Sequence, residues 1–136
     1  MGALNKRIKV LVVDDSVIFR RVLANAVESD IELDLIATAH DAFQAIDIIE
    51  KNMPDVITLD IEMPQMDGYS LTKQIKSNRM YSHIPVVIFS SLISPDIRKK
   101  GDAVGADAQI TKPELAYLLE IVDEIISKLS KKKIRP

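Results

Sequence analysis

Short apolar runs alternate along the chain with longer segments whose apolar residues recur at helical spacing. The runs are rich in Val, Ile and Leu, and they predict strands at 8–13, 33–39, 55–60, 85–90 and 107–111. Near-continuous apolar runs are typical of strands that are buried on both faces of a parallel sheet. The pattern therefore predicts an α/β fold, (βα)5, in which helices cover both faces of the sheet.

The segments between these strands begin with residues that favour helix starts. A Ser or Asp side chain can accept a hydrogen bond from the first turn, and Pro suits the first helical position. Helices are predicted at 17–29, from after Asp41 to near 52–54, from Gly68 to about 77, from Ser94 to about 104–105, and from Pro113 to Leu129.

Composition excludes several functions. The 136 residues suit one domain, and the absence of cysteine excludes disulfides, thiolate metal sites and thiol catalysis. His40 and His83 are the only histidines, which argues against a multi-histidine metal site, and we expect both at the surface. A net charge of −2 gives no reason to expect nucleic acid as a partner. Without a long apolar run or a signal peptide, we expect a cytoplasmic protein with no membrane insertion.

The ends of the predicted strands carry polar side chains. Asp14 and Asp15 follow the first strand, Asp60 ends the third, Ser90 ends the fourth, and Lys112 follows the fifth. In a parallel sheet these positions share the carboxyl edge, where such folds bind ligands. Three crowded carboxylates raise one another's pKa values, and a divalent cation relieves the repulsion. Oxygen ligands without His or Cys indicate Mg²⁺ or Mn²⁺.

Asp60 has the setting of a phosphoacceptor. A carboxylate that attacks phosphorus needs the charge of its target to be neutralised. The metal would neutralise one side of the phosphoryl group and Lys112 another, while the Ser90 hydroxyl can donate to a phosphoryl oxygen. The sequence thus suggests an aspartyl-phosphate site with Asp60 as the acceptor.

Four segments of the chain resemble the response-regulator receiver domain, the CheY-like family: VVDDS, LDIEMPQMDG, VVIFSS and ITKP. They occur in the family's order with family-like gaps. The resemblance implies a flavodoxin-like, doubly wound sheet of strand order 2-1-3-4-5. It also implies a single receiver domain over 1–136, with its core at about 8–130 and a basic tail at 131–136.

The resemblance assigns metal ligands. Asp15 and Asp60 would bind Mg²⁺ directly, Asp14 would bind it through water, and the backbone carbonyl of Glu62 would be a further ligand. Asp60 would receive the phosphoryl group from the phosphohistidine of a histidine kinase.

The resemblance also implies a switch. Ser90 corresponds to the family's switch hydroxyl and Lys112 to its conserved lysine, whose peptide bond to Pro113 is expected to be cis. The candidate modulators are Glu62, Ser91, Leu92 and Gln109. Glu62 and Leu92 stand where family members influence access of the hydrolytic water.

Gln109 departs from the family pattern. In the run 105–112 it occupies the position at which many members carry a rotating aromatic residue. An aromatic flip coupled to Ser90 is therefore not available. We expect the signal to pass instead through the loop 91–95 and the short helix that follows it.

Three segments, FSSLIS, GADAQITKPE and TKQIK, most resemble the receiver domain of CheV-type chemotaxis coupling proteins. In that family a CheW-like coupling domain precedes the receiver. The expected partners are a CheA-like kinase and a chemoreceptor array or coupling domain. A stand-alone CheY-like regulator is the alternative. No helix-turn-helix segment is recognised, so we expect no direct DNA binding.

Three other functions compete with this interpretation. A haloacid-dehalogenase-type hydrolase also uses an Asp nucleophile and Mg²⁺, but it needs a second Asp where Glu62 stands. In a flavodoxin-like electron carrier, Asp14 and Asp15 would repel the FMN phosphate. A phosphorylation-independent scaffold would use only its surface, and Gln109 gives that reading slight support. We expect a signalling domain that catalyses only its own phosphorylation and dephosphorylation.

Overall fold

A parallel sheet forms the centre of the computed structural model, which describes residues 7–91 and 93–112. In this part of the chain the five strands are ordered β2-β1-β3-β4-β5, and every neighbouring pair is parallel. The strands are β1 (Ile8–Val13), β2 (Leu33–Ala39), β3 (Val56–Asp60), β4 (Val86–Ser90) and β5 (Ala108–Thr111). The predicted flavodoxin-like sheet is therefore confirmed.

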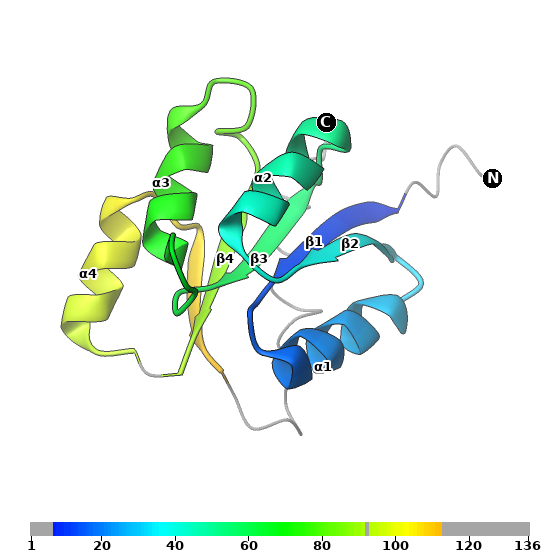
Figure 1. The fold of residues 1–136 in the computed structure, drawn as a ribbon, viewed down its shortest axis with the longest axis horizontal. Helices are drawn as coiled ribbons and strands as arrows, with labels where there is room; N and C mark the ends of the chain where they lie inside the picture. Colours follow the sequence, from blue (N-terminus) through cyan, green and yellow to red (C-terminus); the bar gives the residue numbers. More distant parts are fainter. Residues whose placement is uncertain (1–6, 92, 113–136) are drawn as a thin grey trace.

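Four helices in the described residues connect the strands: α1 (Val17–Glu28), α2 (Ala42–Lys51), α3 (Gly68–Ser77) and α4 (Pro95–Ala103). Figure 1 shows α1 on one side of the sheet and α2, α3 and α4 on the other. The helix predicted from Pro113 and the basic tail lie outside the described residues. Within the described part, no helix has the length and apolar character to cross a membrane.

Each of these helices begins at a polar side chain that accepts a hydrogen bond from a backbone N–H in the first turn. The capping residues are Ser16, Asp41, Asp67 and Ser94. Such caps satisfy N–H groups that have no partner within the helix. The sequence signals for helix starts therefore correspond to observed hydrogen bonds.

Both faces of the sheet are apolar and buried. Along β1, Val10 and Val12 belong to the cluster that α1 covers, whereas Leu11 and Val13 belong to the cluster against α2 and α3. Because successive side chains of a strand point to opposite faces, a strand buried on both sides has no polar positions to alternate with. This explains the continuous apolar runs.

A shielded ion pair fastens α3 to the amino edge of the sheet. Lys76 Nζ donates to Asp107 Oδ2 at 2.8 Å, to the Ile84 carbonyl at 2.7 Å and to the Ser82 carbonyl at 3.2 Å. The same oxygen of Asp107 accepts from Val86 N at 2.9 Å. No local pattern in the sequence indicates this ion pair, which is a finding of the structure.

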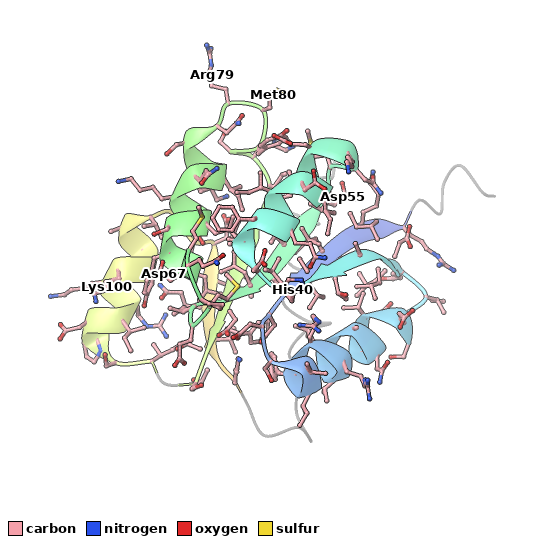
Figure 2. The ribbon with its side chains drawn as sticks, viewed as in Figure 1. His40, Asp55, Asp67, Arg79, Met80 and Lys100 are labelled. Atoms are coloured by element: carbon pink, nitrogen blue, oxygen red, sulfur yellow. The ribbon has the colours of Figure 1, made fainter. Side chains whose placement is uncertain are left out.

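Exposed side chains mark the periphery. Figure 2 shows Arg79 and Met80 projecting from the loop between α3 and β4, and Lys100 projecting from α4. His40 and His83 are both exposed, which confirms their prediction as surface residues.

Replacing Lys76 with Met should lower the free energy of unfolding by about 3 kcal/mol, because Asp107 keeps its charge in a shielded place and loses the ammonium that lies 2.8 Å from its Oδ2. Urea unfolding measures this loss. Lys51→Met is the matched control, since Lys51 pairs with Asp47 at 3.1 Å but the two side chains are 75% and 61% exposed. This control substitution should lower the free energy of unfolding by less than about 1 kcal/mol. Equal losses in the two variants would contradict a structural role for the shielded pair.

Candidate functional site

The strand registers bring the predicted site residues to one edge of the sheet. Val13 pairs with Leu59, so Asp14, which follows β1, lies beside Asp60, the last residue of β3. One oxygen each from Asp14, Asp15 and Asp60 lies within 4.8 Å of the other two. Asp14 and Asp60 are 1% and 2% exposed, whereas Asp15 is open to solvent. The predicted carboxylate cluster is therefore present, with two of its members buried.

Local hydrogen bonds fix the segment after β1. Asp14 N donates to the Ala39 carbonyl at 3.0 Å, and Ser16 N donates to Asp14 Oδ1 at 2.8 Å. Arg20 Nη1 donates to the Asp14 carbonyl oxygen at 2.6 Å. Because Ser16 also caps α1, one turn sets both the carboxylate of Asp14 and the start of the helix.

The loop after β3 returns closely to Asp60. A Cβ on Gly68 would collide with the Asp60 backbone oxygen and would lie 2.8 Å from Ile61 Cα. Gly68 N donates to the Ile61 carbonyl at 2.9 Å, and the Asp67 side chain caps α3. Asp67 and Gly68 thus shape the loop, and α3 begins at Gly68 as predicted.

Lys112 reaches the carboxylates from the end of β5. Its Nζ lies 3.2 Å from Asp14 Oδ2 and 3.4 Å from Asp60 Oδ1. Its backbone N–H donates to the Ser90 carbonyl, which ties the ends of β4 and β5 together. The ammonium also lies 4.5 Å from the centre of the Phe19 ring. Phe19 belongs to the core cluster that α1 covers.

The remaining predicted positions are distributed around this edge. Ser90 is 4% exposed and ends β4 in register with Thr111, and Ser91 is exposed. Leu92 and Pro113 lie outside the described residues, so the predicted cis bond between Lys112 and Pro113 stays a prediction.

Burial raises the pKa of Asp60 to about 6, and repulsion from Asp14 acts in the same direction. Lys112 and a hydrogen bond from the Glu62 backbone act against this rise. Burial also raises the pKa of Asp14. The Glu62 side chain is exposed. Its carbonyl as a metal ligand stays a prediction.

The donor set suits a hard cation. Asp60 Oδ1 is buried and, among the described residues, accepts no hydrogen bond, although Lys112 lies within ion-pair distance of it. A buried carboxylate oxygen that lies beside the oxygens of two further carboxylates is the kind of ligand that Mg²⁺ or Mn²⁺ binds. The residues present therefore fit the predicted ion.

Comparison with known proteins settles which family this arrangement represents. The profile of the response regulator receiver domain matches residues 10–123. The chain belongs to the response regulator receiver domain family. Membership of this family agrees with the strand order of the sheet and with the position of the carboxylates at its carboxyl edge.

The receiver domain is similar to proteins of bacterial chemotaxis. Protein-glutamate methylesterase/protein-glutamine glutaminase 1 of Xanthomonas oryzae pv. oryzae (strain MAFF 311018) is 42% identical over 120 residues, which are 85% of this chain and 33% of that protein. The response regulator domain of Thermotoga maritima CheB has a TM-score of 0.77 and 31% identity, covering 93% of this chain and 96% of that one. CheY4 of Vibrio cholerae has a TM-score of 0.78 and 29% identity, covering 88% and 99%.

These relatives support a chemotaxis receiver without singling out the CheV type, which stays a prediction. The receiver domain spans about a third of the methylesterase that it matches.

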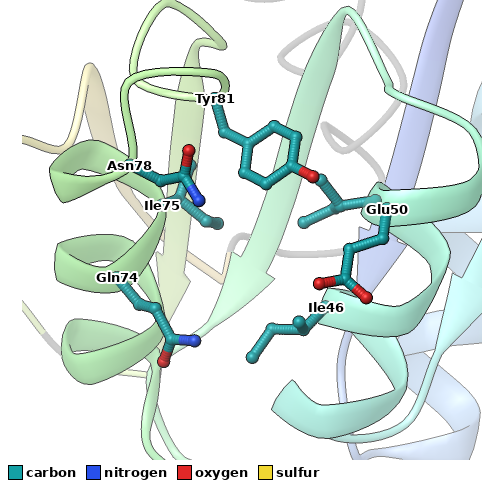
Figure 3. A pocket seen from close by; sticks show the side chains of 7 residues that line it. Ile46, Glu50, Gln74, Ile75, Asn78 and Tyr81 are labelled. Carbon is teal, nitrogen blue, oxygen red and sulfur yellow. The ribbon is translucent and has the colours of Figure 1, made fainter.

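A separate hollow lies between α2 and α3 (Figure 3). Its lining residues are Ile46, Ile49, Glu50, Gln74, Ile75, Asn78 and Tyr81. It shares no residue with the carboxylate cluster, so the candidate site of the receiver domain is the carboxyl edge of the sheet.

Gln109 connects β5 of the receiver domain to α4. It is 7% exposed, and its Nε2 donates to the Arg98 carbonyl and to Asp102 Oδ1, both at 2.9 Å. A Cβ on Gly101 would collide with the Gln109 amide. Gly101 is the one buried residue of α4. The side-chain amide of Gln109 therefore joins β5 to α4 by two hydrogen bonds.

Gly101→Ala should lower the free energy of unfolding by about 1–3 kcal/mol, because the added methyl group overpacks the Gln109 amide. The double variant Gly101→Ala/Gln109→Ala should lose less than the sum of the single changes, as a urea double-mutant cycle would show. Lys100→Ala, on the exposed side of the same helix, is the control for a substitution in α4 away from the Gln109 amide. Strict additivity would contradict the contact.

Asp60→Asn should stabilise the metal-free receiver domain at pH 7 by about 1–3 kcal/mol, since ionising a buried carboxyl costs the folded state. For a raised carboxyl pKa, this cost is absent below the ordinary value of 3.8 and complete above about 6. The gain should therefore grow as pH rises through that window. Urea unfolding in EDTA across this pH range measures the difference, and a variant less stable than the wild type at pH 7 would contradict the account.

Proposed function

We propose that the receiver domain accepts a phosphoryl group on Asp60 from the phosphohistidine of a CheA-like histidine kinase, and that this switches a protein-interaction surface in chemotaxis signalling. The proposal rests on the surroundings of Asp60, a buried carboxylate with an ammonium at 3.4 Å and two further carboxylates beside it. This constellation supplies a nucleophile and a means of neutralising its target.

In the proposed transfer, an Asp60 oxygen forms the O–P bond while the P–N bond of phosphohistidine breaks. The electron pair of the broken bond stays on the imidazole nitrogen. A pKa of about 6 leaves most of the Asp60 carboxyl ionised at neutral pH, so the nucleophile needs no base. Lys112 would neutralise a phosphoryl oxygen, and the Ser90 hydroxyl would donate to another.

Asp15 and Asp60 would hold Mg²⁺, or Mn²⁺, directly, Asp14 through water, and the Glu62 carbonyl would complete the protein ligands. When bound, the ion would supply positive charge that helps to neutralise the phosphoryl group. Asp15 is open to solvent while Asp14 and Asp60 are buried. This arrangement would leave one side of the site open to the incoming phosphoryl donor.

The output would run through α4. The Gln109 amide joins this helix to β5, and α4, which begins at Pro95, is the next element in the chain after β4 and its terminal Ser90. A Ser90 hydroxyl drawn toward the phosphoryl group would move the loop before α4. Phosphorylation would then shift the equilibrium between alternative positions of α4.

The surrounding protein is proposed from the resemblance and the relatives. A CheV-type coupling protein, with a CheW-like domain and a place in the chemoreceptor array, is our preferred context. A stand-alone regulator, as the similarity to CheY4 suggests, is the alternative. The receiver domain itself would act in the cytoplasm and would not be an enzyme for other substrates. Any methylesterase activity would need residues beyond those matched here.

Asp60→Asn should abolish the incorporation of ³²P from labelled acetyl phosphate in the presence of Mg²⁺, because an amide cannot attack phosphorus as a carboxylate does. Asp55→Asn is the matched control: Asp55 precedes the same strand at its other end, where it accepts a hydrogen bond from Lys9 N at 2.8 Å. This control should keep wild-type labelling, and EDTA should remove it.

Label that persists in Asp60→Asn would assign the acceptor to another residue. A wild-type protein that takes no label, with kinase or with acetyl phosphate, would instead favour the phosphorylation-independent scaffold.

A further inference from the structure

The Lys112 ammonium contacts an aromatic ring as well as carboxylates. Its Nζ stands 4.5 Å from the centre of the Phe19 ring and 3.2 Å from Asp14 Oδ2. Phe19 is 8% exposed, and the Lys112 side chain is 18% exposed. A shielded ammonium within this distance of a ring face is attracted by the ring quadrupole.

Phe19 and Lys112 are linked through Asp14 and Ser16 by a continuous set of contacts. Ser16 N donates to Asp14 Oδ1, and the Ser16 hydroxyl accepts from Phe19 N at 3.2 Å. The face of the Phe19 ring contacts Lys112 Nζ, and Lys112 Nζ forms an ion pair with Asp14 Oδ2. The turn that orients the Asp14 carboxylate therefore also sets the backbone from which the ring projects.

A second ring supports the first. Phe89 lies beside Phe19 with the ring centres 5.8 Å apart and the planes at 61°, an edge-to-face arrangement. Phe89 is 1% exposed and directly precedes Ser90 at the end of β4. The plane of Phe19 is thus fixed by the sheet, and its face is available to the ammonium.

A ring face attracts a cation without accepting its N–H groups in the way that an oxygen does. All three donors of the ammonium stay available for oxygens. Lysine also has a flexible four-carbon stem that loses rotamer entropy when it is held in one place. Contact with a fixed ring holds the Lys112 ammonium in position before a phosphoryl group binds. The Lys112 side chain therefore loses less rotamer entropy when the phosphoryl group binds.

We infer that Phe19 is a positioning residue of the phosphoacceptor site, which holds the Lys112 ammonium between Asp14 and Asp60 through the face of its ring. This inference rests on the proposed function, because it concerns how Lys112 meets the phosphoryl group. A packing role alone would require an apolar side chain of this size, whereas the positioning role requires an electron-rich ring face.

The contact is tested first in the unphosphorylated, metal-free protein. The ring should shift the Lys112 ε-methylene proton resonances upfield in NMR spectra, by ring current. Phe19→Leu should remove this shift and Phe19→Tyr should keep it. Wild-type resonances at ordinary lysine positions would overturn the inference whether or not Asp60 accepts a phosphoryl group.

The role is tested by phosphorylation rates with acetyl phosphate and saturating Mg²⁺. Phe19→Leu should slow the reaction about fivefold, the size of a partly shielded cation–π contact, and Phe19→Tyr should restore most of the rate. Phenylalanines with one to three ring fluorines at position 19 should slow it progressively at constant melting temperature, since fluorine withdraws charge from the ring face. Fluorination at Phe43, which is 53% exposed, is the control.

The outcomes separate the two ideas. A wild-type protein that takes no phosphoryl group would overturn the proposed function, while the ring-current measurement still decides the contact. A labelled wild-type protein whose rate is unchanged by fluorination, or by Phe19→Leu, would overturn the inference and leave the proposed function standing.

Discussion

Two buried carboxylates side by side are the constraint on which the site depends. Asp14 follows β1 and Asp60 ends β3, and the parallel register of these neighbouring strands places the two carboxylates beside each other. Burial raises the pKa values of both carboxyls, and repulsion from Asp14 adds to the rise at Asp60. Lys112, at the end of β5, offsets part of this cost by facing both. An arrangement so rich in negative charge is poised to bind a cation and, with its help, an anionic phosphoryl group.

The surrounding structure holds these charges in place. Ser16 and Arg20 fix Asp14 from the start of α1, and Gly68 lets α3 approach Asp60 closely. Phe19 contacts the ammonium from the side of α1. The groups that orient the site therefore come from the first turns of helices that begin at the carboxyl edge of the sheet.

The sheet and its acidic edge were predictable because they follow from local patterns and topology. Apolar runs gave the strands, capping residues gave the helix starts, and parallel pairing then required Asp14, Asp60 and Lys112 to converge. Contacts between side chains of distant segments were not predictable in this way. Lys76 with Asp107, and Phe19 with Lys112, depend on rotamers and register that leave no local signal.

Gln109 lies between these cases. Its departure from the family pattern was visible in the sequence, but its partners on α4 were not, because they require the helix to be placed first. The pairing with Gly101 shows that a large polar side chain on β5 is accommodated by removing a side chain from α4. The proposed output through α4 draws on the hydrogen bonds between Gln109 and this helix.

The central claim is that the carboxyl edge binds a phosphoryl group at Asp60 and transmits this to α4. It is tested most directly by two-dimensional ¹⁵N–¹H NMR of the receiver domain titrated with beryllofluoride and Mg²⁺, which together mimic the aspartyl phosphate. The account predicts that amide resonances change at Asp60, Ser90 and Lys112 and along α4, while those of the hollow between α2 and α3 stay in place. Spectra that remain unchanged at Asp60 and Lys112 would contradict it.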